Sequence, residues 1–185
     1  MELVRINGII LNMNNKLVFK KLTDFQPGIL FDLLTKSYDQ FITSSGLTNP
    51  QKFISKWRRF DENAFNNLRI GKCVLVSCLG DKVIGFASYD PRRLPEFGVV
   101  GQNVILPEYR RMGYGKAQIE EIIRIFKSKK CRKVIVSTGE IDFFKPAQSM
   151  YLNLGFKESR KFKREDIEFG EIEYELKLEN NSPSN

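Results

Sequence analysis

The segment from residue 98 to residue 137 constrains the fold most. It begins with the apolar run "GVVGQNVIL" (98–106) and ends with the short apolar run "KVIVS" (133–137), and both are typical of strands. Between them, four apolar residues follow the i, i+3, i+4, i+7 spacing of one helix face, namely Ile119, Ile122, Ile123 and Phe126. A strand–helix–strand unit of this kind forms a right-handed crossover and sets its two strands parallel. The chain is therefore predicted to be an α/β protein.

The rest of the chain predicts antiparallel strands around this unit. Runs 73–79 and 82–89 flank Gly80-Asp81 and indicate a hairpin, and alternation in the last strand predicts one buried face and one solvated face that carries Glu171, Glu173 and Glu175. The glycine inside 98–106 predicts a bulge. The remaining predicted elements are a strand at 16–22, helices at 28–41, 50–66 and 146–154, and an antiparallel strand pair that ends the chain. We thus expect a mixed, largely antiparallel sheet flanked by helices.

Length and composition bound the class of protein. A chain of 185 residues with 42% apolar residues fits a single domain, which we place at 1–179 with a polar tail at 180–185; residues 1–16 are read as an edge strand or a poorly ordered arm. No apolar run is long enough for a membrane span. The three cysteines form no CxxC pair, which favours a reducing cytoplasm. Histidine is absent, so a histidine-centred zinc site is excluded and no metal site is predicted.

The stretch "YRRMGYGK" (109–116) opens the central helix with features of an anion site. The first turn of a helix has N–H groups without intrahelical partners, and the helix dipole favours an anion there. Gly113 and Gly115 leave these groups accessible, while Arg110, Arg111 and Lys116 add mobile positive charge. The spacing matches neither a GK[ST] phosphate loop nor G-x-G-x-x-G. Taken alone, the pattern also fits a plain glycine turn with exposed arginines.

A second motif removes much of this ambiguity. R-x-x-G-x-G is followed, a helix and a strand later, by A-x-x-x-Y-x-x-x-G-F, which here is Ala147, Tyr151, Gly155 and Phe156. The two motifs together resemble the GNAT N-acetyltransferases, strongly over residues 70–160 and by element order outside them. The resemblance implies the GNAT fold, with acetyl-CoA as the acetyl donor and an amine as the acceptor, and it leaves open whether the chain forms a homodimer.

The resemblance also implies where the cofactor would bind. The diphosphate would lie on the N–H groups of about 111–116, and the pantetheine arm would run beside strand 98–106, whose bulge we expect at Gly101 or at 102–103. An N–H group near Asn103–Ile105 would face the thioester oxygen. The cofactor-binding positions implied are Val104, Ile105, Leu106, Arg110, Arg111, Met112, Gly113, Tyr114, Gly115, Lys116 and Ala147.

Transfer of the acetyl group needs a proton donor and a proton acceptor. Tyr151 occupies the family's acid position, and its alternative role is that of a packed aromatic residue; a tyrosine can protonate a departing thiolate. Glu96 and Asp90 are the two candidates for the base that accepts the amine's proton, directly or through a water. Each also fits the alternative of a plain surface carboxylate. Phe144 stands where many relatives have an asparagine, so the pantetheine arm is expected to rely on backbone and apolar contacts.

The net charge of +8 raises the question of a nucleic-acid partner. The basic run 157–164 faces the acidic run 171–175 in the expected terminal hairpin, and no RNA-recognition or helix-turn-helix signature is present. We therefore expect no nucleic-acid partner and no membrane partner. A nucleic-acid-binding module is one alternative to an acetyltransferase, and a catalytically silent protein that senses coenzyme A is the second. The identity of the acceptor amine stays open.

Overall fold

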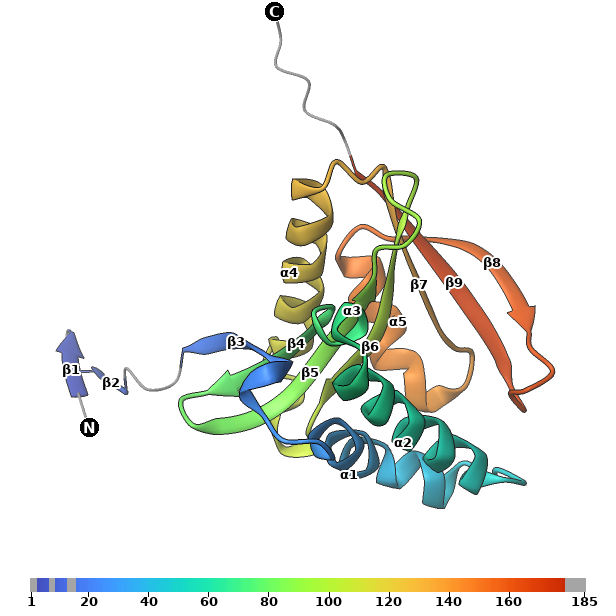
Figure 1. Cartoon of the computed structure of the whole chain (residues 1–185), viewed down its shortest axis with the longest axis horizontal. Helices are drawn as coiled ribbons and strands as arrows, with labels where there is room; N and C mark the ends of the chain where they lie inside the picture. The colour runs from blue at the N-terminus through green and yellow to red at the C-terminus, as the bar shows by residue number, and fades with distance from the viewer. Residues whose placement is uncertain (1–2, 7–8, 13–15, 179–185) are drawn as a thin grey trace, which may run out of the picture.

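The computed structural model of the chain, which describes residues 3–6, 9–12 and 16–178, is built on one seven-stranded sheet (Figure 1). Its strand order is β3-β4-β5-β6-β7-β9-β8, and only β6 and β7 pair in parallel. The strands are β3 (Leu17–Lys21), β4 (Val74–Leu79), β5 (Lys82–Asp90), β6 (Gly98–Ile105), β7 (Lys133–Gly139), β8 (Lys157–Lys163) and β9 (Gly170–Lys177). The predicted mixed, largely antiparallel sheet is confirmed, as is the hairpin of β4 and β5.

Helices cover both faces of this sheet. Two large buried clusters and one small one make up the core: of the large ones, one joins α1 and α2 to β4 and β5, and the other joins α4 and α5 to β6, β7 and β9. Figure 1 shows α1 and α2 together at one end of the sheet and α4 standing apart from them. The helices are α1 (Ile29–Ser44), α2 (Pro50–Asn66), α3 (Leu68–Gly71), α4 (Tyr114–Ser128) and α5 (Lys145–Asn153), with short 3-10 turns η2 (Leu22–Asp24), η3 (Pro107–Tyr109) and η4 (Asp142–Phe144). The predicted crossover β6–α4–β7 is therefore confirmed.

The first residues of the chain form a separate element. β1 (Leu3–Ile6) and β2 (Ile9–Asn12) pair with each other in an antiparallel hairpin and do not extend the seven-stranded sheet. Of the two expected alternatives, an edge strand of the main sheet is therefore not formed by β1 or β2, and the rest of residues 1–15 lies outside the described residues. The predicted polar tail at 180–185 lies outside the described residues.

β6 and β7 separate halfway along their length. Their parallel pairing covers only Gly98–Val100 against Val134–Val136. Beyond that point β6 carries the expected bulge, because Gly101 and Gln102 together face the single residue Ser88 of β5. The Gln102 N–H donates to Ser88 Oγ at 2.8 Å, and a Cβ at position 101 would lie 2.5 Å from that oxygen. A glycine is therefore required where the sheet opens.

A carboxylate from α2 fixes the start of α1. α1 begins after Gly28, whose φ of +97° is in the left-handed region, and no side chain of its own caps it. Asp61 fills that role from α2: its carboxylate accepts from the N–H groups of Gly28 (2.8 Å), Leu30 (3.0 Å) and Phe31 (3.3 Å). Asp61 is only 5% exposed, so these bonds are shielded from water. Asp61 thereby fixes the position of α1 relative to α2.

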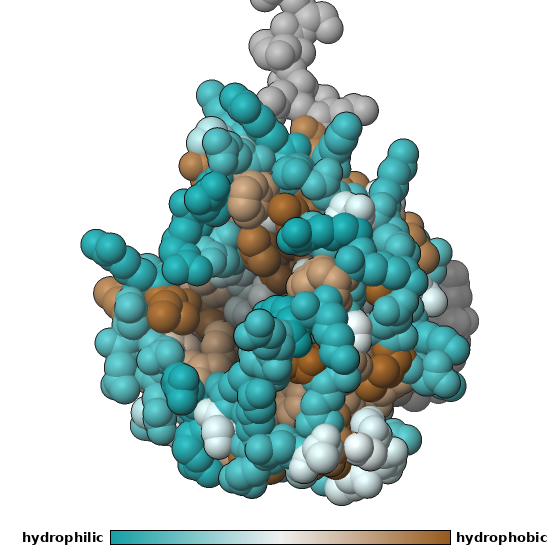
Figure 2. All heavy atoms as spheres, turned by 90° about the vertical axis from the view of Figure 1, so that its right-hand side faces the viewer, coloured by the Kyte–Doolittle hydropathy of each residue, from teal (hydrophilic) through white to brown (hydrophobic). Residues whose placement is uncertain are grey.

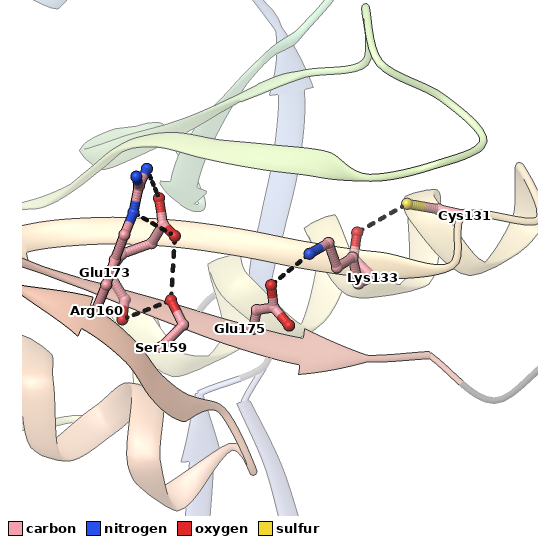
Figure 3. A network of polar contacts seen from close by, with 6 residues as sticks. All are labelled: Cys131, Lys133, Ser159, Arg160, Glu173 and Glu175. Atoms are coloured by element: carbon pink, nitrogen blue, oxygen red, sulfur yellow. Dashed lines mark hydrogen bonds and ion pairs between the residues drawn. The ribbon is translucent and has the colours of Figure 1, made fainter.

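The charges of the terminal hairpin are largely paired, as expected (Figure 3). Arg160 on β8 lies opposite Glu173 on β9 and contacts it at 2.9 Å, while Glu175 contacts Lys133 on β7 at 2.5 Å. One prediction for this hairpin is wrong: the glutamates of β9 do not all face solvent, because Glu171 is only 9% exposed. None of the helices in the described part of the chain combines the length and apolar character needed to cross a membrane.

Candidate functional site

Two cavities meet where β6 leaves β7. The first has a volume of about 490 Å³ and lies between α1, the turn from β6 to α4, and the η4–α5 segment. The second has a volume of about 250 Å³ and lies between α1, α2, the separated strands β6 and β7, α5, and the loop 164–169 that joins β8 to β9. Four residues line both cavities: Tyr38, Asn103, Phe144 and Ala147. On the side of the molecule toward β8 and β9, Figure 2 shows hydrophobic surface lying in hollows between hydrophilic ridges.

The N-terminus of α4 lies at the wall of the first cavity. Gly113 is the residue before the helix, with φ of +84°, and a Cβ built there meets nothing within 4 Å. Gly115 and Lys116 of the first helical turn line the same cavity. The N–H groups of this turn have no intrahelical acceptors, and the positive end of the helix dipole coincides with them. The N–H groups at this end of the cavity are therefore placed to bind an anion, and the two glycines leave them unobstructed.

Most of the sequence-predicted cofactor positions lie at this cavity. Those that line it are Val104, Ile105, Arg110, Arg111, Gly113, Gly115, Lys116 and Ala147. Leu106, Met112 and Tyr114 do not line it; Met112 is 60% exposed, and Tyr114 packs against the small cluster of Leu79, Ile84 and Ile105. The structure thus brings the motif residues to one place through the β6–α4 turn.

Arg110 is held in place rather than mobile, which differs from the sequence-based expectation. Its Nε donates to the carbonyl of Ile105 at 3.2 Å, and its Nη2 donates to the carbonyl of Ser37 on α1. The guanidinium also lies 6.0 Å from the ring centroid of Phe143. Arg110 therefore ties β6 to α1 and places a fixed positive charge in the first cavity.

Tyr151 projects from α5 into the second cavity and is 4% exposed. Its ring packs against Phe156 and Tyr174, with centroid separations of 5.8 and 6.0 Å. Burial raises the pKa of the Tyr151 hydroxyl well above its usual value, and Tyr38 adds to this; the nearby Asn103 amide acts in the opposite direction. The hydroxyl is consequently protonated at neutral pH, and its raised pKa makes it a weaker proton donor than an exposed tyrosine.

Asn103 lies at the junction of the cavities, on β6 just past the bulge. Its Nδ2 donates to the carbonyl of Gly115 at 3.5 Å, which links β6 to the start of α4. Its Oδ1 is buried and accepts no hydrogen bond from the described residues. The junction therefore offers one unused acceptor beside the edge of β6 that β7 has left.

Tyr38 and Phe144 are two further candidate site residues, because both line the two cavities. Tyr38 also stacks on Trp57 at 5.4 Å between centroids; no motif in the sequence singled it out. Burial raises the pKa of its hydroxyl, and Arg110 offsets part of this effect. Phe144 forms the apolar partition between the cavities, 6.3 Å from the Tyr38 ring.

The two carboxylates considered as bases lie elsewhere. Glu96 lines neither cavity; its side chain is 65% exposed and sits 3.9 Å from Arg93. Asp90 also lines neither, and its hydrogen bonds with Arg92 lower the pKa of its carboxyl group. The one carboxylate among the described lining residues of the two cavities is Glu171. Sequence reasoning missed it because alternation along β9 assigned it to the solvated face.

Comparisons with known proteins agree with this geometry. The family model described as the Acetyltransferase (GNAT) family matches residues 33–156. Among solved structures, the PaiA N-acetyltransferase of Thermoplasma acidophilum in complex with coenzyme A is similar at a TM-score of 0.66 and 16% identity, over 88% of this chain and 99% of that one. Among curated protein sequences, none is similar enough to count as a relative.

Two further solved structures share the fold. The yncA protein of Salmonella typhimurium, solved with its cofactor acetyl-CoA, has a TM-score of 0.61 at 12% identity, over 92% of this chain and 98% of that one. The ribosomal-protein-S18-alanine N-acetyltransferase of Escherichia coli has a TM-score of 0.56 at 15% identity, over the same shares. At these identities the likeness concerns the fold.

Proposed function

Because the chain belongs to the GNAT acetyltransferase family, we propose that it transfers the acetyl group of acetyl-CoA to a primary amine. The observation that carries this proposal is the pairing of two cavities. One ends at an unobstructed helix N-terminus, the other contains a buried, protonated tyrosine, and they share a wall at the point where the sheet opens. A donor and an acceptor can therefore meet between them.

The cofactor would occupy the first cavity. Its diphosphate would accept hydrogen bonds from the N–H groups at the start of α4, with Arg111 and Lys116 adding positive charge. Its pantetheine arm would follow β6 beyond Val100, where β7 no longer occupies that edge. The Thermoplasma protein solved with coenzyme A and the Salmonella protein solved with acetyl-CoA support this choice of cofactor.

The chain's own residues would then act on the thioester in sequence. A neutral amine in the second cavity attacks the carbonyl carbon, forming a C–N bond, and N–H groups near Asn103–Ile105 donate to the oxygen as its negative charge grows. The C–S bond breaks as Tyr151 donates its proton to the sulfur. The nitrogen's surplus proton leaves, directly or through water, and returns to the tyrosinate. The products are an amide and a free thiol, and the enzyme regains its starting charge.

Calorimetry and a thiol-release assay test this proposal. We expect acetyl-CoA to bind with a dissociation constant between low micromolar and sub-millimolar, and salt to weaken binding because the diphosphate end is electrostatic. With acetyl-CoA and a broad panel of amines, free thiol should form at a rate that depends on the amine. The absence of both heat and a thermal shift at millimolar acetyl-CoA would refute cofactor binding. Tight binding without thiol release from any amine would instead favour a coenzyme A sensor.

A further inference from the structure

The second cavity defines the class of acceptor more narrowly than the family does. Resting on the proposed function, we propose that Glu171 anchors the acceptor's ammonium group before transfer, that this group then gives up one proton to water and attacks as the neutral amine, and that the acceptor is a primary amine on a compact apolar body. Three features of the cavity carry this assignment: a buried carboxylate, a wall of aromatic rings, and a loop tied across its outer side.

Glu171 has unused hydrogen-bonding capacity. It lines the second cavity, it is only 9% exposed, and its Oε2 is buried without a hydrogen bond from any described residue. Arg164 Nε lies 2.9 Å from that oxygen, but the contact is an ion pair without hydrogen-bond geometry. A buried carboxylate oxygen that accepts no hydrogen bond is costly, and an ammonium group supplies the missing donors.

The positive charges near Glu171 are already engaged. Lys56 and Arg164 line the cavity too, and both contact Asp166, at 2.5 and 3.3 Å. Together with the Arg164–Glu171 contact, this leaves the lining cations compensated by acidic partners. Arg164 balances the charge of Glu171 as well, but Glu171 Oε2 still accepts no hydrogen bond, so a ligand that donates hydrogen bonds, such as an ammonium group, completes it.

Aromatic rings form the walls around that carboxylate. A ligand here would meet ring faces and edges on one side and polar groups such as Gln102, Ser137 and Thr138 on the other, which suits an apolar body that carries a polar end, and ring faces also attract an ammonium group. The rings lie on helices α1, α2 and α5, on η4 and on the loop 164–169, with neighbouring centroids 5.3 to 6.5 Å apart in the pairs Phe41–Phe53, Phe41–Phe169 and Phe53–Trp57. Tyr38 and Phe144 complete the wall toward the first cavity.

The loop 164–169 restricts the size of the acceptor. Glu168 accepts from the N–H and Oγ1 of Thr48 at 2.8 and 2.6 Å and from the N–H of Asn49 at 3.1 Å, so the loop is tied to the start of α2. The Lys56–Asp166 pair adds a second tie. The cavity volume of about 250 Å³ lies below the roughly 300–1,000 Å³ typical of pockets for drug-sized ligands. A compact amine fits this space better than an extended chain.

Binding to the coenzyme A-loaded protein tests the proposal without turnover. The probes are 2-phenylethylamine, a compact apolar amine, and 2-phenylethanol, its neutral counterpart, each titrated calorimetrically into the protein saturated with coenzyme A. We expect the amine to bind at least tenfold more tightly than the alcohol. Glu171→Gln should weaken binding of the amine by about tenfold to a hundredfold and leave the affinity for the alcohol unchanged, because only the charge-assisted hydrogen bond is lost.

Glu173→Gln is the matched control, since Glu173 is two residues along β9 on the same face but pairs with Arg160 and lines neither cavity. It should bind both probes as the parent does. An unchanged amine affinity in Glu171→Gln, equal weakening of amine and alcohol, or no binding of 2-phenylethylamine to the coenzyme A complex would each overturn the proposal. These results are separable from failure of the proposed function, because coenzyme A affinity is measured first on every variant and also reports that the variant is folded.

Discussion

Replacing Tyr151 by phenylalanine should slow the transfer step and leave cofactor binding intact. The substitution removes one hydroxyl and keeps the ring that packs on Phe156 and Tyr174, so the fold should lose no more than about 1.5 kcal/mol. General acids contribute about 10²–10⁴ to a rate, and they do best with a pKa near the working pH. Burial raises the pKa of this hydroxyl, which makes it a weak acid and points to the lower end of the range. We therefore expect kcat to fall by about a hundredfold, equivalent to about 2.7 kcal/mol.

Two measurements on the same variant separate catalysis from positioning. Saturating thiol-release rates give kcat, and calorimetry gives the dissociation constant of acetyl-CoA, which should change by less than about threefold, or about 0.65 kcal/mol. Tyr174→Phe is the control, because Tyr174 is equally buried beside Tyr151 but lines neither cavity. A kcat within twofold of the parent's, or an equal loss in the control, would refute the assignment of Tyr151 as the acid.

Three further predictions follow from the geometry. Gly113→Val should lose measurable coenzyme A binding in calorimetry, because a branched side chain would stand over the start of α4. The control is Gly28→Val, where the glycine also has a positive φ and open space around it. Both variants should lose about 1–2 kcal/mol of stability, but Gly28→Val should bind coenzyme A normally. Asp61→Ala should lower the free energy of urea unfolding by about 2–4 kcal/mol, because three N–H groups at the start of α1 lose their acceptor, whereas the exposed Asp39→Ala should change it by no more than about 0.5 kcal/mol. Folding raises the pKa values of Tyr38 and Tyr151 above 10.0, so their contribution to stability is fully present below pH 10 and is lost as the pH rises beyond it. The free energy of urea unfolding should therefore be lower at pH 11 than at pH 9. Tyr151→Phe should make this difference smaller.

The parts of the fold that depend on neighbours in sequence could be predicted from sequence. The crossover from β6 through α4 to β7 follows from one helical stripe between two apolar runs, and the hairpin of β4 and β5 follows from Gly80-Asp81. Gly101 indicated the bulge because a glycine inside a strand needs a local reason, and the reason here is the close approach of Ser88. Gly113 and Gly115 at the start of α4 indicated a place for an anion for a different reason, since they leave the N–H groups of the first turn accessible.

The parts that depend on distant contacts could not be predicted. Glu171 follows the alternation of a solvated face, and its burial arises because α2 and the loop 164–169 close over it, with Lys56 and Asp166 meeting across 110 positions of sequence. Arg110 was expected to remain mobile, but the carbonyl of Ser37, 73 positions away, holds it. No local pattern reveals that Asp61 is the acceptor for the start of α1.

The shared wall of the two cavities has a thermodynamic consequence. Tyr38, Asn103, Phe144 and Ala147 face both spaces, so a shift of any of them on binding one ligand alters the surface offered to the other. If donor binding changes the acceptor's affinity by some factor, linkage requires that acceptor binding change the donor's affinity by the same factor. Phe144 forms the apolar part of this partition, and its size should set the coupling free energy between the two substrates.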